Sequence, residues 1–371
     1  MVSGCDQKRY PYLCSNKENK MDFEQKLIVV TSRHDCYDNR IYEKQIKSFL
    51  KAGYVITYVF PICSGPIPTL FNLTPKKLKS GSIIKKHIEI FNIIRRERID
   101  KLLIHDPDLL IIGLLAKWFL NLRVFFDSHE DVALDIKVNK NYNVVRAQIV
   151  SRLMNLFLAF TLKRLTGVIT VTDEIGYKFA EMGANIKVVK NYPVIIRKES
   201  NKSLRLIVYS GTISKTRGFD RMIDLMQLLP DFNLILAGWI SPCISKDELR
   251  KLPSNVRYVG QHSARTINQI YSKASFGLCL LDPLPTFKES LPMKILEYTG
   301  NGVIPVVSDF KYWREFYPDA LGLIYNADLQ TTAKKIRDIN HEGIDLPIIV
   351  SETIRCYSWS KEEEKLLKFL S

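Results

Sequence analysis

Two glutamates with seven residues between them mark the segment richest in side chains that could do chemistry. Glu289 lies in a loop and Glu297 in a helix that we expect to be capped near Ser290, with Pro292 in its first turn. The free N–H groups of that turn and the ammonium of Lys294 suit a phosphate. Because carboxylates only accept hydrogen bonds, one glutamate on each side of a phosphate site can bind hydroxyls of two different sugars.

The elements that position this segment follow a regular pattern. Strands alternating with helices, twice along the chain, predict parallel sheets with helices on both faces. We expect an α/β fold of two Rossmann-like, doubly wound domains facing each other across a cleft, with ligands bound beyond the carboxyl ends of the strands. The expected strands are 26–31, 54–60, 102–104, 123–126, 167–172, 204–209, 233–237, 256–259, 277–281, 303–307 and 322–325, and the first-half helices 42–52, 83–98, 109–119, 145–165 and 174–182.

Composition changes along the chain predict the domain boundaries. Residues 1–20 are polar, and we expect a disordered extension or an upstream start there. A first domain over 21–195 is followed by a polar linker at 196–203 and a second domain over 204–350. Residues 351–371 predict a C-terminal helix, capped by Ser360, that packs back toward the first domain.

The composition of the 371 residues is that of an ordinary globular protein with an unusual charge. There are 54 Lys and Arg against 39 Asp and Glu, a net charge of +15, which implies an anionic partner: nucleic acid, an anionic membrane surface or a phosphate-bearing substrate. The seven cysteines contain no C-x-x-C pair, so we expect neither a disulfide framework nor a zinc site, and a reducing cytosol is the simplest setting. Charges interrupt or bound the apolar runs 109–122 and 153–162, so we expect no membrane span.

At this point the sequence resembles a known family. The arrangement L-P-x-K-x-x-E-Y followed by G-x-x-P-V-V is similar to the donor-binding signature of retaining GT-B glycosyltransferases of the family 4 type, including those of bacterial surface-polysaccharide assembly. The resemblance extends from about Lys26 over nearly the whole chain. It includes the segments HDPD at 105–108, DSHE at 127–130, KNYP at 190–193, YSG at 209–211, RG at 217–218 and YSW at 357–359.

The resemblance implies that the first domain, 21–195, binds the acceptor and that the second, 204–350, binds the nucleotide-sugar, and it implies a role for each matching residue. Glu289 would contact hydroxyls of the transferred sugar and Glu297 the ribose of the nucleotide, while His129 would face the donor sugar from the first domain. Arg217 would neutralise the donor diphosphate, and the turn at Gly211 would let backbone approach it. In such enzymes the acceptor attacks on the face from which the diphosphate leaves, a donor phosphate oxygen takes the proton, and no protein nucleophile or metal is needed.

The sequence departs from the family in two places. A second basic residue usually follows the glycine matched by Gly211, and here it is Thr212, so we expect Lys215 or Lys294 to compensate. The double-glycine loop after the first strand is replaced by residues 32–40. In this loop we take Asp38 and Arg40 as candidates for binding the acceptor.

Several reactive residues also have an ordinary structural interpretation. The D-x-D pattern of Asp106 and Asp108 formally matches a metal motif, but it joins a strand to an apolar helix, where we expect Asp108 to cap the helix, so we expect no metal and no other cofactor. Arg217 and Glu297 are of types that are commonly solvated surface residues. We treat the remaining histidines His34, His87, His262 and His341 as surface or structural residues.

The leading hypothesis is a cytoplasmic glycosyltransferase, peripheral on the inner face of the membrane, that moves a sugar from a nucleotide-sugar to a lipid-linked or polysaccharide acceptor. Basic residues at 76–98, with Arg146, Arg152, Lys163 and Arg164 around an apolar helix, favour docking on anionic lipid over a merely solvated face. A sugar-nucleotide epimerase on the same fold is an alternative, whereas a phosphorylase lacks a visible phosphate or cofactor-lysine site. A basic nucleic-acid-binding protein would need a module or aromatic–basic pattern that is not visible, and a dehydrogenase a G-x-G-x-x-G after the first strand.

Overall fold

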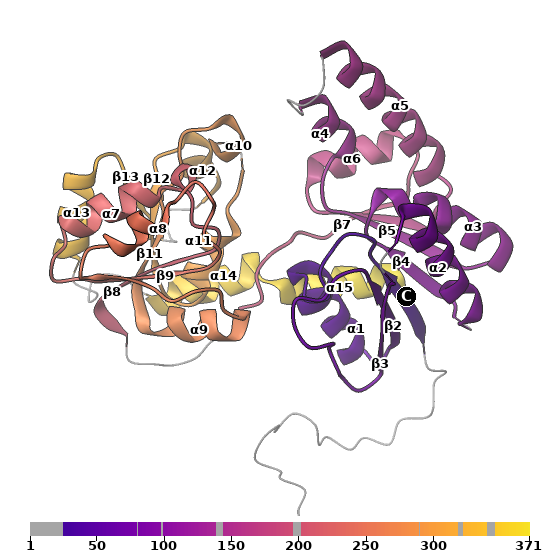
Figure 1. Cartoon of the computed structure of the whole chain (residues 1–371), viewed down its shortest axis with the longest axis horizontal. Coiled ribbons are helices and arrows are strands. Elements are labelled where there is room, and N and C mark those ends of the chain that lie inside the picture. Colours follow the sequence, from indigo (N-terminus) through magenta and orange to yellow (C-terminus); the bar gives the residue numbers. More distant parts are fainter. Residues whose placement is uncertain are drawn as a thin grey trace, which may run out of the picture. The chain divides into compact units, whose positions relative to one another are not determined.

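The computed structural model describes residues 25–79, 81–97, 99–138, 144–195, 202–288, 290–317, 322–339 and 346–371 (Figure 1). The chain divides into two compact units, residues up to Val168 with Phe179–Asn185, and Ile169–Lys178 with Ile186–Ser371. The expected extension at 1–20 and most of the expected linker at 196–203 lie outside the described residues. Each half carries one sheet, so the predicted pair of Rossmann-like domains is confirmed.

The first sheet has seven strands in the order β3-β2-β1-β4-β5-β6-β7. The central strand β1 pairs in parallel with β2 on one side and β4 on the other. The chain therefore reverses its direction of winding between β1 and β4, and ligands of open α/β sheets bind at the carboxyl ends of strands at such a point. The strands are β1 Lys26–Val30, β2 Val55–Phe60, β3 Leu73–Lys77, β4 Lys101–Ile104, β5 Arg123–Ser128, β6 Gly167–Thr170 and β7 Ile186–Val188.

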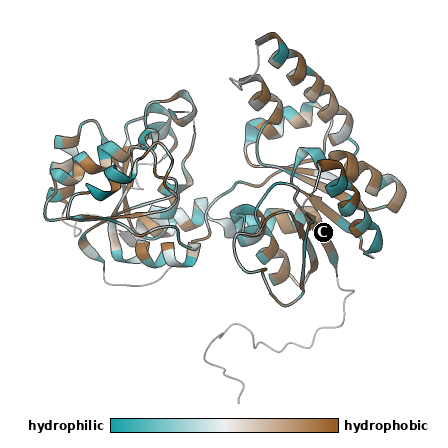
Figure 2. Cartoon of the chain, in the orientation of Figure 1, coloured by the Kyte–Doolittle hydropathy of each residue, from teal (hydrophilic) through white to brown (hydrophobic). Residues whose placement is uncertain are grey.

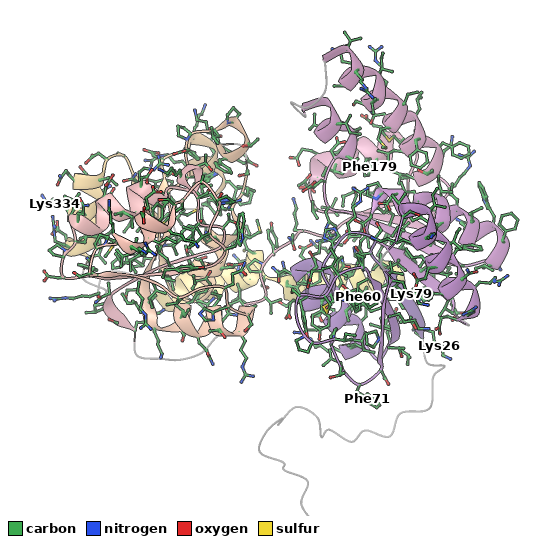
Figure 3. The ribbon with its side chains drawn as sticks, in the orientation of Figure 1. Lys26, Phe60, Phe71, Lys79, Phe179 and Lys334 are labelled. Atoms are coloured by element: carbon green, nitrogen blue, oxygen red, sulfur yellow. A yellow bond between two sulfur atoms is a disulfide. The ribbon has the colours of Figure 1, made fainter. Side chains whose placement is uncertain are left out.

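The helices around this sheet begin with an unusual element. Residues Asn39–Ile46 form a π-helix, η1, which continues into α1 Lys47–Lys51, where an ordinary helix over 42–52 was expected. The aromatic side chain of Phe60 is buried in the first domain, whereas Phe71, in the loop before β3, is 89% exposed (Figure 3). The other helices are α2 Ile83–Arg96, η2 Pro107–Leu109, α3 Leu110–Leu120, α4 Val132–Val138, α5 Val144–Leu162 and α6 Asp173–Glu181.

The second sheet has six strands in the order β10-β9-β8-β11-β12-β13, and its strand pairs are parallel. Here the winding reverses between β8 and β11. The strands are β8 Ser203–Ser210, β9 Asn233–Ala237, β10 Val256–Tyr258, β11 Ala274–Cys279, β12 Ile304–Ser308 and β13 Ile324–Asn326. The helices are η3 Lys215–Arg217, α7 Phe219–Gln227, α8 Lys246–Arg250, α9 Ala264–Lys273, α10 Pro285–Lys288, α11 Met293–Gly300, α12 Lys311–Phe316, α13 Leu329–Asp338, α14 Leu346–Tyr357 and α15 Trp359–Leu370.

The C-terminal helix begins earlier than predicted. Ser358 occupies the N-cap position of α15 without capping through its side chain, and the Ser360 hydroxyl lies 2.7 Å from the Ser358 hydroxyl. Glu362, a buried residue of α15, accepts a 2.8 Å hydrogen bond from the backbone N–H of Lys190, just after β7. The helix is thus fixed to the edge strand of the first sheet within its own compact unit.

Two cysteines that were expected to be free form a disulfide bond. Cys36 follows β1 and Cys63 follows β2, and their sulfurs are joined. The strands are neighbours in the sheet, so the loops that leave their carboxyl ends run side by side. Among the described residues Cys243, Cys279 and Cys356 are free. The bond is at odds with the expectation of a reducing setting, where disulfides are rare.

One helix in the described part of the chain has the length and hydropathy of a membrane span. The window Val145–Leu162 of α5 qualifies. It contains the run 153–162, for which we expected no span because charges bound it. Only 28% of the window is buried in the structure. α5 packs against α4 and contacts α3, and brown, apolar residues run along α3 and α5 in Figure 2.

Candidate functional site

The carboxyl edge of the second sheet is built from glycines at strand ends. Gly211 follows β8 with φ +118° and donates its N–H to Ala237 at 2.8 Å. Gly238 follows β9 with φ +140°, and a Cβ on it would lie 1.9 Å from the carbonyl oxygen of Gly211. At Gly218, with φ +85°, a Cβ would lie 1.9 Å from the carbonyl oxygen of Leu280. Only glycine permits this close approach of backbones at the point where the winding reverses.

Lys294 places its ammonium at this edge. The side chain comes from the first turn of α11, and Nζ lies 3.6 Å from the centre of the Tyr209 ring. A Cβ on Gly211 would be 3.3 Å from the same nitrogen. Burial lowers the pKa of Lys294 to about 8. The ring face stabilises the cation, and an anion at this place would meet an ammonium, a helix N-terminus and backbone.

Arg217 and Lys215, the two other basic candidates, differ in their surroundings. The guanidinium carbon of Arg217, at the end of η3, lies 5.6 Å from the centre of the Phe287 ring, and its charge acts on Lys294. Lys215 is exposed and forms a 3.0 Å ion pair with Glu248 on α8. Arg217 and Lys294 are therefore the stronger donor candidates, whereas Lys215 is the weaker one because it already pairs with Glu248. The donor-binding role of all three residues stays a prediction.

Glu297 lies on the following turn of α11 and is partly buried. Its carboxylate accepts a 3.2 Å hydrogen bond from the hydroxyl of Tyr271, which lies in the last turn of α9. The same hydroxyl shares a short hydrogen bond with Ser210, at the end of β8. Tyr271 thus ties the carboxylate to the strand end, and sequence reasoning offered no signal for it. The second oxygen of Glu297 remains available to accept a hydroxyl group.

The start of α11 corrects one expectation and leaves another open. Ser290 does not cap the helix, because its hydroxyl donates to the carbonyl of Phe287 at 3.2 Å, and Pro292 occupies the N-cap position. Trp313 and Tyr317 donate to the carbonyls of Ser290 and Pro292, which fixes this loop. Glu289, the candidate for contacting the transferred sugar, lies outside the described residues, and its role stays a prediction.

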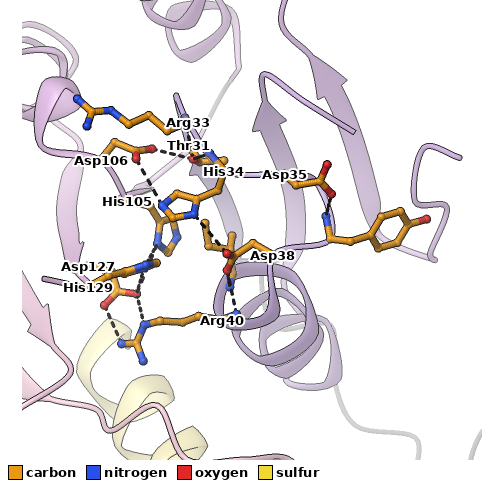
Figure 4. Close-up of polar contacts among 12 residues, drawn as sticks. Thr31, Arg33, His34, Asp35, Asp38, Arg40, His105, Asp106, Asp127 and His129 are labelled. Atoms are coloured by element: carbon orange, nitrogen blue, oxygen red, sulfur yellow. Dashed lines mark hydrogen bonds and ion pairs between the residues drawn. The ribbon is translucent and has the colours of Figure 1, made fainter. Parts of the chain in front are cut away.

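A second cluster lies at the carboxyl edge of the first sheet, where its winding reverses (Figure 4). His129 follows β5, and its Nε2 lies 3.3 Å from Oδ2 of Asp127 and 3.3 Å from Nδ1 of His105. Nδ1 of His105 is 3.4 Å from the same Asp127 oxygen. Asp127 and His105 have fully buried side chains, whereas the side chain of His129 is 21% exposed. His129 is therefore the member of the trio that a substrate can reach.

The charges of this cluster are set by burial and by Arg40. Burial alone would raise the pKa of Asp127, but the Arg40 charge and the two histidines hold it well below its usual range. Burial lowers the pKa of His105, so this histidine is neutral near pH 7. A neutral His105 donates one ring proton to Asp127 and leaves Nε2, which is buried without a partner among the described residues, as a bare acceptor.

The two acceptor candidates have structural partners. Arg40 is 3% exposed, and its Nε and Nη2 donate to the two oxygens of Asp127, each at 2.7 Å, so its guanidinium is turned into the protein rather than toward an acceptor. Asp38 accepts from the N–H groups of Arg40 and Ile41 at 2.9 Å and caps the π-helix. Burial opposes its ionisation, yet hydrogen bonds from His34 and Ile41 lower the pKa of Asp38 to about 2.

His34, which sequence reasoning treated as a surface or structural residue, joins this cluster. Its ring centre lies 5.1 Å from that of His129, and its two nitrogens lie 3.3 Å from Asp38 and 3.5 Å from Asp106. The hydrogen bond to Asp38 is the main cause that raises the pKa of His34. Asp106 also accepts from the hydroxyl of Thr31 at 2.7 Å. The only signal in the sequence was that these residues follow expected strands.

Asp108 of the D-x-D pattern does not cap the helix as expected. It lies inside η2 and pairs with Arg33 at 3.0 Å and His87 at 2.9 Å. In the described part of the chain the arrangement closest to a metal site is instead His105, Asp127 and His129, whose ligand atoms all lie within 4.8 Å of one another. Both oxygens of Asp127 already accept from Arg40, whose positive charge disfavours a dication there.

Comparisons with known proteins agree with this geometry. Residues 194–348 match the family described as Glycosyl transferases group 1. No curated protein sequence matches the chain.

Solved structures of the GT-B type share the fold. Sucrose-phosphate synthase from Thermosynechococcus elongatus is similar with a TM-score of 0.66 at 12% identity, covering 93% of this chain and 98% of its own. HepE from Anabaena, solved with UDP and glucose, has a TM-score of 0.63 at 13% identity, covering 94% and 99%. WaaG, a glycosyltransferase involved in lipopolysaccharide biosynthesis, has a TM-score of 0.62 at 12% identity, covering 93% and 99%.

Proposed function

We propose that this glycosyltransferase moves a sugar, with retention of configuration, from a nucleoside-diphosphate donor to a lipid-linked or polysaccharide acceptor in the synthesis of a surface polysaccharide. The observation that carries the proposal is the pairing of Lys294 and Glu297 on α11 inside the matched glycosyl transferase domain. The site offers cations for a diphosphate and a carboxylate for a ribose within one helix.

The chemistry needs charge stabilisation at the leaving group. When the bond between sugar and diphosphate breaks, negative charge builds on the diphosphate. Lys294, Arg217 and the first N–H groups of α11 present fixed positive charge to it, and the Gly211 turn lets backbone come close. A donor phosphate oxygen takes the proton of the attacking acceptor hydroxyl, so no protein nucleophile is required.

The donor most worth testing first is UDP-glucose, because the similar HepE was solved in complex with UDP-glucose. In this proposal transfer needs no metal, since Arg40 already donates to both oxygens of Asp127, the carboxylate between the clustered histidines. His129 and Glu289 contact the transferred sugar.

Donor binding is the first test. The full chain is titrated calorimetrically with UDP, UDP-glucose and a panel of other sugar nucleotides in the presence of EDTA. We expect micromolar to millimolar binding of at least one donor, and slow release of its sugar in water. Binding of no donor would overturn the proposal, and return of an epimerised sugar nucleotide would favour an epimerase instead.

We further propose that the first domain docks on an anionic membrane surface through the outward face of α5. Its apolar residues recur at helical spacing and are strongly exposed: Val145 63%, Ile149 53%, Leu153 60%, Leu156 68% and Phe160 49%. At about 100° per residue these five positions fall within roughly one quarter of the helix circumference. An exposed stripe of this kind is unusual on a soluble surface.

Positive charge accompanies this stripe. Arg146 and Arg152 are exposed and, at about 100° per residue, border the stripe on either side. Lys163, just after the end of α5, is exposed too, and α5 carries no acidic residue. Trp118 and Phe119 at the end of α3, which contacts α5, are 54% and 73% exposed. Apolar side chains that enter the headgroup region beside basic ones that meet anionic lipid are typical of an interfacial helix.

Vesicle binding tests this surface. We expect the protein to sediment with phosphatidylglycerol vesicles, to bind phosphatidylcholine vesicles poorly, and to be released in part by salt. A Leu153→Ser/Leu156→Ser variant should lose most vesicle binding but keep donor affinity, whereas Ile67→Ser, an exposed control far along the chain, should keep both. Equal vesicle binding by the double variant, or preference for RNA over vesicles at moderate salt, would contradict the proposal.

A further inference from the structure

The π-helix η1 places two side chains on one buried carboxylate. The N–H of Glu43 donates to the carbonyl of Asp38, five residues earlier, at 3.3 Å. In such a helix residues i and i+5 point in more similar directions than in an α-helix, where they would point about 140° apart. Arg40 and Gln45 are related in this way, and both reach Asp127.

The carboxylate of Asp127 accepts hydrogen bonds from both of these side chains. Arg40 binds both its oxygens at 2.7 Å, and Gln45 Nε2 donates to Oδ2 at 2.6 Å. The amide oxygen of Gln45 is buried and lacks a partner among the described residues. A buried acceptor without a partner costs free energy, so the amide is oriented for its donor, toward Asp127.

The held oxygen faces His129. Oδ2 of Asp127 lies 3.3 Å from Nε2 of His129 and 3.4 Å from Nδ1 of His105. The two nitrogens also lie 3.3 Å from each other. An ionised carboxylate only accepts, and in the arrangement proposed below both nitrogens carry their protons toward it, which leaves Nδ1 of His129 with a lone pair. His129 has the exposed side chain of the trio, so this nitrogen can accept a hydrogen bond from a hydroxyl group.

We propose that Arg40 and Gln45 are positioning residues, which act through Asp127 to hold His129 as the Nε2–H tautomer with Nδ1 free for a substrate hydroxyl. The tautomer assignment rests on the contacts with Asp127, and its effect on catalysis rests on the proposed glycosyl transfer. The π-helical winding of η1 brings Arg40 and Gln45 to the same carboxylate.

The experiment joins a spectroscopic readout with kinetics. The chain has six histidines, so ¹⁵N-histidine labelling of the full protein gives a simple spectrum, in which His129→Gln identifies the His129 signals. The ¹⁵N shifts show which ring nitrogen carries the proton. The variants are Gln45→Met, an apolar near-isostere, and Arg40→Lys, which keeps the charge but not the two-pronged contact. Glu43→Gln, on the same π-helix with its carboxylate turned to Lys47, is the matched control.

We expect the Nε2–H tautomer in the wild type and in Glu43→Gln, and a mixture in Gln45→Met and Arg40→Lys. Transfer by Gln45→Met should show kcat lowered about 10-fold with the donor KM changed by less than about twofold, because the donor residues lie on the other sheet. A wild-type His129 protonated at Nδ1, or unchanged tautomer and kcat in Gln45→Met, would overturn the proposal. If Arg40→Lys does not fold, Gln45→Met decides. The predicted tautomers without any wild-type transfer would instead refute the proposed function.

Discussion

The ammonium of Lys294 lies over the ring of Tyr209, 3.6 Å from its centre, and no carboxylate among the described residues forms an ion pair with it. The lysine comes from α11 and the tyrosine from β8, so packing of a helix on a strand end creates a cation that faces the Gly211 turn. A cation held by a neutral ring keeps its charge for an incoming anion.

Lys294→Met should weaken binding of a nucleoside diphosphate about 10- to 100-fold, because one charge-assisted hydrogen bond is lost. In the wild type, affinity should fall as the pH rises through about 8, where Lys294 loses its proton. A bound diphosphate stabilises the protonated form of Lys294, so the pKa of Lys294 lies higher in the complex than in the free protein. Calorimetry from pH 6.5 to 9.5 measures both effects.

Lys215→Met is the matched control for this prediction. Lys215 is exposed and paired with Glu248, so its loss should change donor affinity by less than about twofold. A larger effect at Lys215 than at Lys294, or a pH dependence that persists in Lys294→Met, would contradict the assignment.

Glu297→Gln should weaken UDP binding about 10-fold, since a neutral amide oxygen is a poorer acceptor for ribose hydroxyls than a carboxylate. Tyr271→Phe removes the hydroxyl that donates to Glu297 at 3.2 Å and should have a smaller effect, within about fivefold. Competition between UDP and uracil measures where the loss arises, because only the ribose-containing ligand should be affected. Equal UDP affinity in Glu297→Gln and the wild type would remove Glu297 from the site.

Gly238→Ala should lower the free energy of unfolding by about 2 kcal/mol or more, because the new Cβ would lie 1.9 Å from the carbonyl oxygen of Gly211. Gly260→Ala is the matched control, since Gly260 also has a positive φ, +86°, but no atom within 4 Å of a Cβ. Its cost should be limited to backbone strain of about 1 kcal/mol. Urea denaturation measures both, and equal losses would contradict the close approach of the two backbones.

Reduction of the Cys36–Cys63 bond should lower the free energy of unfolding by about 3 to 4 kcal/mol, from the entropy of a loop closed over a separation of 27 residues. The same loss is expected for Cys36→Ser/Cys63→Ser without reductant. Cys243→Ser removes an exposed free thiol and should leave stability unchanged. Unfolding midpoints that do not respond to dithiothreitol would mean that the two thiols are free in the folded protein.

Local patterns in the sequence predicted most strands because each has a β-branched, buried run. β9 was placed at its full extent, and β1 to within one residue. β3 was missed because its sequence LTPKK contains a proline and two lysines, which only an edge strand tolerates. β7 was also missed: its run IKV is short, carries a lysine and is only partly buried at all three positions.

The same difference between local and long-range contacts applies to the candidate site. The sequence placed Lys294 and Glu297 on one helix because their spacing is local, and their role in donor binding stays a prediction. The contacts of Arg40 with Asp127 and of His34 with His129 were not found, because they depend on β1, β4 and β5 lying side by side. The π-helical turn was not predictable either, because the apolar spacing of 42–52 fits an ordinary helix and the contacts of Arg40 and Gln45 with Asp127 are long-range.

The measurement that tests the central claim most directly is transfer of an isotope-labelled sugar. UDP-[¹³C]glucose and the other donors that bind are incubated with the protein, EDTA and lipid-linked glycans extracted from membranes, and the products are analysed by mass spectrometry and NMR. The account predicts a labelled glycan with the anomeric configuration of the donor, formed by the wild type and lost in Glu289→Ala and Glu297→Ala at retained fold. Donor binding with no labelled glycan under any donor, or equal product from both variants, would contradict it.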